Sequence, residues 1–192
     1  MSDLPKKIRA FVAVRISETV LGQLVSAQQQ LKSKFSGVSW TRAEAMHMTL
    51  QFLGNIESAR LPELQTALRQ ATEQIPSFEI ELAGLGSFGN RVLWVGVNRG
   101  AEPLTRLAEA VRRATKGLGV QEEERPFNAH VTLGRFRQTA RGVSKVLREA
   151  AAPNFGSWRV NEFELIRSEL SPNGARHTML LTFPLRLTGE GA

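Results

Sequence analysis

A short pattern in which His and Thr alternate with apolar residues occurs twice in this chain of 192 residues, as HMTL beginning at His47 and as HVTL beginning at His130. The two histidines lie 83 positions apart, and the same shift aligns the apolar run Phe11–Val14 with Trp94–Val97. Similarity at one fixed, long spacing is typical of a structural unit that is used twice. The chain must therefore adopt a fold that accommodates two copies of one unit.

Apolar periodicity and turn residues predict that each copy runs strand, helix, strand, helix, strand. The first copy spans 8–84, with strands at 8–14, at the first His motif and at 77–82, and helices at 17–35 and 58–72. The second spans 91–167, with strands at 91–97, at the second motif and at 157–165, and helices at 102–116 and 139–151. We expect Gly54 and Asn55 to end the first motif strand, and a closing strand at 176–185.

No linker rich in Gly, Pro or Ser separates the two copies. We therefore predict a single compact domain over residues 1–192 that consists of two pseudo-symmetric lobes. The sequence leaves open whether strands cross from one lobe to the other.

The two motifs place their polar residues on one face of a strand. Side chains alternate between the faces of a strand, and the apolar residues of each motif must face the core. His47 and Thr49 then share the opposite face, as His130 and Thr132 do in the second copy. If an approximate two-fold axis relates the copies, both His-Thr pairs converge on one groove.

Two imidazoles that face one substrate suit in-line displacement at a phosphodiester. One ring takes a proton from the attacking oxygen and the other gives a proton to the leaving oxygen, and His serves in either role near its reference pKa of about 6.5. The two Thr hydroxyls can donate hydrogen bonds to phosphate oxygens. The residues alone do not decide which His is the acid, and the scheme needs no metal or cofactor.

Composition favours an anionic partner. The net charge is +7, the sequence pI is about 10.7, and arginine, which binds phosphate through two parallel hydrogen bonds, makes up 19 of the 25 basic residues. The chain has no cysteine, which excludes disulfides, thiolate metal sites and a Cys nucleophile. It has no apolar run of about 18 residues and no apolar stretch at its start, so we expect a cytoplasmic protein without membrane contact.

Basic residues also gather in sequence around the second motif. They suit the backbone phosphates of RNA, although the helical spacing of the last three is equally typical of a solvated helix face. The set is Arg125, Arg135, Arg137, Arg141, Lys145 and Arg148.

The paired motifs resemble the HxTx motifs of the two-histidine phosphoesterase superfamily. Within it, Trp40, the stretch HMTLQFLGN from His47, HVTLGR from His130 and SELSPNGAR from Ser168 resemble the bacterial and archaeal RNA 2′,3′-cyclic phosphodiesterases, historically called 2′-5′ RNA ligases. The resemblance covers nearly the whole chain. It implies a bilobal α+β fold in which two antiparallel sheets form a central groove with helices outside.

The resemblance also implies an activity and the residues that carry it. The activity is hydrolysis of a terminal 2′,3′-cyclic phosphate of RNA to a 2′-phosphate without metal or cofactor, with reversible 2′-5′ RNA ligation as a possible second reaction. His47 is implied as proton donor to the departing 3′ oxygen and His130 as proton acceptor. Thr49 and Thr132 are implied as phosphate ligands.

Arg135 is implied as a further phosphate contact, although strict alternation would turn it toward the core. We therefore expect a bend or bulge at Gly134. Phe11, Trp40 and Phe52 are candidates for stacking on a base, as single-stranded RNA recognition often requires. His177 stands where relatives commonly have tyrosine, and we expect it to be structural or peripheral.

Other functions remain open. A small cyclic nucleotide or a 2′-5′ oligonucleotide is an alternative substrate, and a non-catalytic RNA-binding module is an alternative from another class. A metal site has little support, because two histidines on different strands lack carboxylates at ligand spacing. We expect a monomer that needs no protein partner and acts on RNA with a 2′,3′-cyclic phosphate end.

Overall fold

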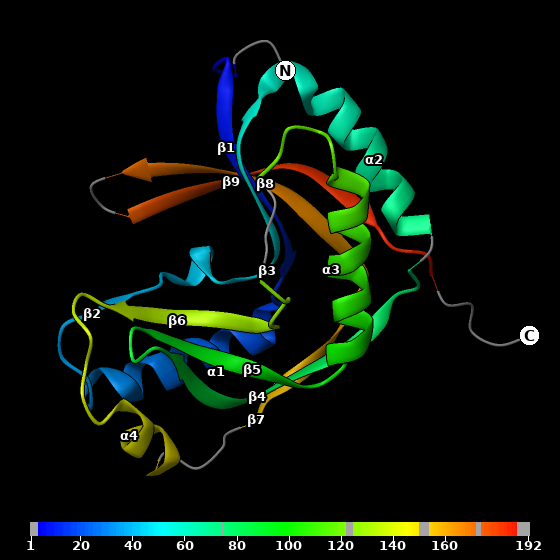
Figure 1. Ribbon diagram of the computed structural model, residues 1–192. Helices are drawn as coiled ribbons and strands as arrows, with labels where there is room; N and C mark the ends of the chain where they lie inside the picture. Colours follow the sequence, from blue (N-terminus) through cyan, green and yellow to red (C-terminus); the bar gives the residue numbers. More distant parts are fainter. Residues whose placement is uncertain (1–3, 74, 122–124, 150–153, 172–173, 188–192) are drawn as a thin grey trace, which may run out of the picture.

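The protein consists of two antiparallel sheets, each with helices on its outer side (Figure 1). The computed structural model describes residues 4–73, 75–121, 125–149, 154–171 and 174–187. The predicted α+β class with two antiparallel sheets is confirmed. No helix within the described ranges is long and apolar enough to cross a membrane.

Sheet I has the strand order β3-β1-β8-β9, and sheet II has the order β2-β6-β5-β4-β7. The strands of sheet I are β1 (Lys7–Arg15), β3 (His47–Glu57), β8 (Glu162–Ser171) and β9 (Gly174–Pro184). Those of sheet II are β2 (Val38–Trp40), β4 (Phe78–Phe88), β5 (Val92–Arg99), β6 (His130–Phe136) and β7 (Asn154–Val160). Each motif strand thus lies beside the first strand of its own repeat, β3 beside β1 and β6 beside β5.

The third strand of each repeat crosses to the sheet of the other repeat. β4 comes from the first repeat but pairs with β5, and β8 comes from the second repeat but pairs with β1. The sheets therefore have matching cores, β3-β1-β8 and β6-β5-β4, each completed by a strand from the other half. Neither half of the sequence contains all the strands of its own sheet.

The helices cross in the same way. They are α1 (Glu18–Lys32), α2 (Leu61–Glu73), α3 (Ala101–Thr115) and α4 (Val143–Glu149), with single 3₁₀ turns at η1 (Ala43–Ala45) and η2 (Ser58–Arg60). α1 follows β1 of sheet I but reaches sheet II, where Gln28 contacts the Leu133 carbonyl of β6. α3 follows β5 of sheet II but reaches sheet I, where Thr115 contacts Gln51 of β3. Figure 1 shows α2 and α3 side by side on one flank and α1 and α4 at sheet II.

One continuous apolar core lies between the sheets and the helices. Val12 and Val14 of β1, Leu24 of α1 and Leu107 of α3 are all buried in it. The start of α1 follows directly from the sequence, because Ser17 caps the helix by accepting a hydrogen bond from the backbone N–H of Val20. Burial of one face of each sheet leaves the opposite face free to build a site.

Two predicted boundaries are wrong for tertiary reasons. The first motif strand does not end at Gly54 and Asn55 but continues to Glu57, because both residues pair with β1, Gly54 with Ala10 and Asn55 with Arg9. The break in the pairing falls at Leu53 instead. The single strand expected at 157–165 is two strands, β7 and β8, separated by Asn161. β7 pairs with β4 in sheet II and β8 with β9 in sheet I, and an alternating apolar pattern cannot show that change of sheet.

The remaining differences concern element ends. α1 stops at Lys32 rather than at residue 35, and α4 covers Val143–Glu149 of the helix expected at 139–151, whose last two residues lie outside the described ranges. The short edge strand β2 was not expected. It forms because residues 38–40 pair with 134–136 of β6.

Gln28 should contribute more to stability than an exposed glutamine of the same helix. It is 5% exposed, and its Nε2 donates hydrogen bonds to the carbonyls of Thr41 (2.7 Å) and Leu133 (2.9 Å). Gln28→Met removes both donors and leaves the Thr41 carbonyl short of a partner. We expect the free energy of unfolding to fall by about 1–3 kcal/mol in urea denaturation. Gln29→Met, an exposed change on the same helix, is the control, and equal losses for the two variants would contradict this role.

Candidate active site

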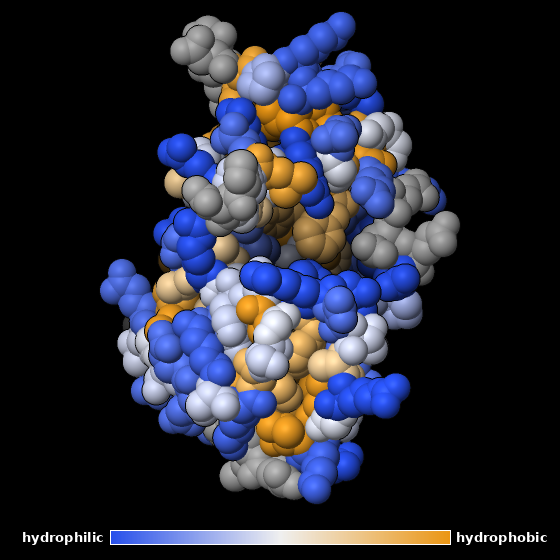
Figure 2. Space-filling model, turned by 90° about the vertical axis from the view of Figure 1, so that its left-hand side faces the viewer, coloured by the Kyte–Doolittle hydropathy of each residue, from blue (hydrophilic) through white to orange (hydrophobic). Residues whose placement is uncertain are grey.

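A groove of about 800 Å³ opens between the two sheets. Figure 2 faces its open side and shows a hollow between the two halves, flanked by hydrophilic side chains. All the residues singled out as site candidates from the sequence line it. They are Phe11, Trp40, His47, Thr49, Phe52, His130, Thr132 and Arg135.

Alternation along β3 and β6 accounts for the first part of each motif. His47 and Thr49 are partly exposed and line the groove, whereas Met48 between them is fully buried. His130 and Thr132 repeat the arrangement around fully buried Val131. The two His-Thr pairs therefore enter one groove from opposite sheets.

A bulge then reverses the alternation at the same point of both motifs. Leu50 of β3 has no pairing partner on β1. Leu133 of β6, 83 residues later, likewise has no pairing partner on β5. Because a bulge shifts the face by one residue, Phe52 and Arg135 turn into the groove. The irregularity expected at Gly134 is confirmed, and the residue that has no pairing partner on β5 is its neighbour Leu133.

Gly134 allows the edge strand β2 to approach the bulge closely. A Cβ at this position would lie 2.7 Å from Cγ1 of Val38 and 3.2 Å from the carbonyl oxygen of Ser39. Val38 and Ser39 both belong to β2, so any larger residue would push β2 away. Trp40, also of β2, lines the groove because of this close approach.

Each motif histidine is held by a backbone carbonyl two residues before it and by an aromatic ring. Nδ1 of His130 lies 2.7 Å from the carbonyl oxygen of Asn128, which can only accept, so Nδ1 donates and Nε2 is left as the basic nitrogen. The ring of Phe88 meets His130 edge-on at 4.9 Å. His47 donates to the carbonyl of Ala45.

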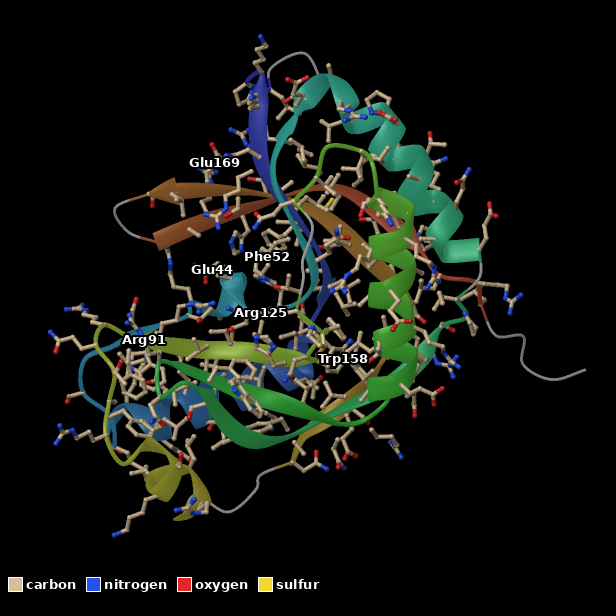
Figure 3. All side chains as sticks on the ribbon, in the orientation of Figure 1. Glu44, Phe52, Arg91, Arg125, Trp158 and Glu169 are labelled. Carbon is tan, nitrogen blue, oxygen red and sulfur yellow. The ribbon has the colours of Figure 1, made fainter. Side chains whose placement is uncertain are left out.

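The three aromatic candidates differ in what they present to the groove. Phe52 is 44% exposed, and Figure 3 shows it in the space between the two sheets. Trp40 is partly exposed. Phe11 is only 2% exposed and stacks on the His47 ring at 4.6 Å. Its face is therefore already covered, and it supports a histidine instead of offering a surface to a base.

Burial and charge disfavour protonation of both motif histidines. Burial, the largest cause, acts with the charges of His177 and His130 to lower the pKa of His47 to about 4, against the raising effect of its backbone hydrogen bond. Burial and then the charge of Arg135 lower the pKa of His130, while the hydrogen bond to Asn128 opposes them. Both shifts favour the neutral imidazole at pH 7.

Of the two roles expected for His177, structural or peripheral, the peripheral one is wrong. It lies in β9 opposite Ser168, and the β8–β9 hairpin brings it over the groove to 5.1 Å from the His47 ring. Its place directly after Gly174-Ala175-Arg176, a stretch that carries part of the family resemblance, was the available sequence signal. It was missed because nothing in the sequence shows that the hairpin folds back beside β1.

The charges that line the groove are all positive. Arg9 and Arg42 join Arg135 in the lining, and none of the described lining residues is acidic. Of the basic residues expected to gather around the second motif, only Arg135 lines the groove, and the others lie elsewhere. Within the described ranges, no three His, Asp or Glu side chains gather as a metal site would require. The arrangement suits an anion held between two imidazoles.

Comparison with known proteins agrees with this geometry. The family model of the 2′-5′ RNA ligase superfamily matches residues 13–172. The chain is 34% identical to the RNA 2′,3′-cyclic phosphodiesterase of Archaeoglobus fulgidus, over 92% of this chain and 99% of that protein. It is also 34% identical to the enzyme of the same name from Aquifex aeolicus, over 94% and 98%.

Solved structures share the fold. A protein of Thermus thermophilus superposes with a TM-score of 0.80 at 32% identity, covering 96% of this chain and 100% of its own. LigT of E. coli complexed with 3′-AMP superposes with a TM-score of 0.79 at 25% identity, covering 93% and 98%.

The low pKa of His47 can be measured directly. In phosphate-free buffer we expect the Cε1 proton of His47 to titrate in NMR spectra with a midpoint near pH 4, and that of His130 below pH 6.5. Inorganic phosphate should raise both midpoints, because a nearby anion stabilises imidazolium. The chain unfolded in urea is the control, with both midpoints near about 6.5. A His47 midpoint of 6.5 or higher in the folded, phosphate-free protein would contradict this description.

Proposed function

The chain belongs to the 2′-5′ RNA ligase superfamily, and on that basis we propose that it hydrolyses the 2′,3′-cyclic phosphate at the end of an RNA strand to a 2′-phosphate. The observation that carries this proposal is the pair of imidazoles, His47 and His130, that enter one groove from equivalent positions of opposite sheets. Both motifs come from one chain, so a monomer can supply both histidines. We propose that the reaction takes place in the cytoplasm and uses no metal or cofactor.

The two histidines divide the proton transfers of an in-line displacement. Nε2 of His130 accepts a proton from water as the water oxygen attacks phosphorus. The bond from phosphorus to the 3′ oxygen breaks on the far side, and His47 donates a proton to that oxygen. The products are a 2′-phosphate and a 3′-hydroxyl, and exchange with solvent restores both histidines.

The remaining groove residues hold the phosphate between the two rings. Thr49 and Thr132 stand two residues after the histidines on the same faces, where their hydroxyls can donate to the non-bridging oxygens. Arg135 adds a fixed positive charge beside His130. Holding the phosphorus in line with both proton-transfer groups lowers the barrier chiefly through orientation.

The proposed acid receives its proton together with the substrate. A neutral His47 cannot donate, and its pKa of about 4 leaves it neutral at pH 7 in the groove by itself. The negative charge of a bound phosphodiester raises that pKa, because it stabilises imidazolium in a site with little water. Substrate binding and loading of the acid are therefore coupled.

RNA is the favoured substrate because the groove combines positive charge with an exposed aromatic ring. Arg9, Arg42 and Arg135 line it together with Phe52, and single-stranded nucleic acid binds through such cations and stacking platforms. A mononucleoside cyclic phosphate is the second candidate. It is favoured by the likeness to a LigT structure complexed with 3′-AMP.

We predict that the protein turns over a cyclic RNA end in the presence of a chelator. An oligonucleotide that ends in a 2′,3′-cyclic phosphate should give only the 2′-phosphate, as read by the regiochemistry of the product in ³¹P NMR. His47→Ala and His130→Ala should each lower kcat by about 10²-fold to 10⁴-fold, because each removes one proton-transfer group.

Three outcomes test the alternatives. A higher kcat/KM for a mononucleoside cyclic phosphate than for the oligonucleotide would favour the small substrate. Salt-sensitive RNA binding with no turnover, unchanged in both alanine variants, would indicate a binding module. Turnover only after addition of a divalent metal would reject the proposed chemistry.

A substrate with sulfur in place of the bridging 3′ oxygen tests which histidine is the acid. A thiol pKa of about 8.5 makes the thiolate a good leaving group that needs no proton donor. We expect His47→Ala to recover most of the wild-type rate on this substrate and His130→Ala to remain slow. If only His130→Ala recovered the wild-type rate on this substrate, His130 would be the acid and His47 the base.

A further inference from the structure

Three rings from three strands of sheet I form one cluster at the groove. The ring of Phe11 from β1 stacks on the imidazole of His47 from β3 at 4.6 Å, with an interplanar angle of 27°. His177 from β9 meets His47 edge-on at 5.1 Å and 74°, and meets Phe11 at 5.0 Å and 73°. The His47 ring is thus held on one face and along one edge.

The place of His177 is set by the sheet and not by a flexible surface. It pairs with Ser168 of β8, and β8 pairs with β1 through the neighbouring Arg167 and Ala10. β9 is an edge strand of sheet I, and Gly174, Ala175 and His177 line the groove along the β8–β9 hairpin. β3 and β9 are the two edges of sheet I, so the rings of His47 and His177 meet above the groove face of the strands between them, where Phe11 of β1 contacts both.

The second motif histidine has no such neighbour among the described residues. His130 also has an edge-on ring beside it, that of Phe88 at 4.9 Å and 88°, and Phe88 in turn contacts Trp94 at 5.1 Å. Phenylalanine and indole rings give the same mechanical support but cannot take up a proton. Of the two motif histidines, only His47 therefore has a titratable ring in contact with it within the described part of the chain.

We propose that His177 is a positioning residue for His47: its ring fixes the plane of the His47 imidazole against Phe11, and its protonation competes with protonation of His47 across the edge-on contact. This inference rests on the proposed function. Its consequence is that His177 adds to burial in disfavouring a proton on His47 before an anionic phosphate shares the groove. His177 would thus limit uptake of the catalytic proton before substrate binds.

The charges around His47 support this competition. The charge of His177 is the largest charge effect that lowers the pKa of His47, ahead of that of His130. Burial and the charge of Arg9 in turn lower the pKa of His177. The charged and titratable groups on the elements packed around His47 include Arg9 and the Arg15–Glu164 ion pair from β1 and β8, His130 and Arg135 from β6, and the Arg42–Glu44 ion pair at η1. β8 also carries the Arg167–Glu169 ion pair, and β9 carries His177 and Arg176. Of these, His177 is the group in ring contact.

Variants at position 177 separate its two roles. His177→Phe keeps a ring of similar size and removes the titrating group, whereas His177→Ala removes both. Thr178→Val is the matched control, because Thr178 is exposed on the same strand, does not line the groove and points to the other face. The pH dependence of kcat/KM reports the free protein, so its alkaline limb follows the loading of the acid.

For His177→Phe we expect the alkaline limb of kcat/KM and the NMR midpoint of His47 to move up by about half a pH unit or more, with maximal kcat within about threefold of wild type. For His177→Ala we expect maximal kcat to fall about tenfold, because the His47 ring is no longer fixed. Thr178→Val should match the wild-type chain in both readouts.

A His177→Phe profile and His47 midpoint that superimpose on wild type would overturn the inference, as would a His177→Ala variant with unchanged kcat. If thermal denaturation shows that His177→Ala is not folded at the assay temperature, the result for His177→Phe by itself decides the inference. The NMR midpoint does not depend on turnover. A chain that fails to hydrolyse cyclic RNA ends therefore rejects the proposed function, while the shift of His47 in His177→Phe still decides this inference.

Discussion

The exchange of strands between the two halves of the chain is the constraint on which the site depends. β4 leaves the first repeat to pair with β5, and β8 leaves the second to pair with β1, so each sheet is completed by the other half. This reciprocal pairing holds the sheets together across the groove. Two imidazoles on separate strands can share one phosphate only when their sheets are fixed in this way, since catalysis by two groups depends on their relative position.

The paired bulges make a nearly symmetric groove directional. Leu50 and Leu133 are passed over at equivalent points, and the next groove-facing residues are Phe52 in one sheet and Arg135 in the other. One motif therefore ends in an aromatic ring and the other in a cation. A nucleotide carries its base and its phosphate at different ends. It can therefore bind more favourably in one direction along the groove, with its base toward the aromatic ring and its phosphate toward the cation, than in the opposite direction.

Burial of the two histidines has a chemical consequence. Desolvation is the first cause of the lowered pKa at both His47 and His130, and each ring is packed against an aromatic neighbour, while the hydrogen bond to a backbone carbonyl opposes the shift. The same removal of water strengthens every interaction with a bound phosphate. The groove thus favours neutral imidazoles by itself and a charged imidazole beside an anion, which is the state that acid catalysis requires.

The sequence by itself determined the duplication, the two His-Thr pairs and their faces, because the 83-residue spacing and local alternation can be read directly along the chain. The class of fold followed from the family resemblance of its motifs. The sequence also placed Arg135 correctly, once a bulge beside Gly134 was supposed. Only the tertiary structure decided that strands cross between the halves, that residues 157–165 divide between two sheets, and that His177 reaches His47. These features depend on hydrogen bonds between strands far apart in the chain, and an apolar pattern records which face of a strand is buried but not which strand lies beside it.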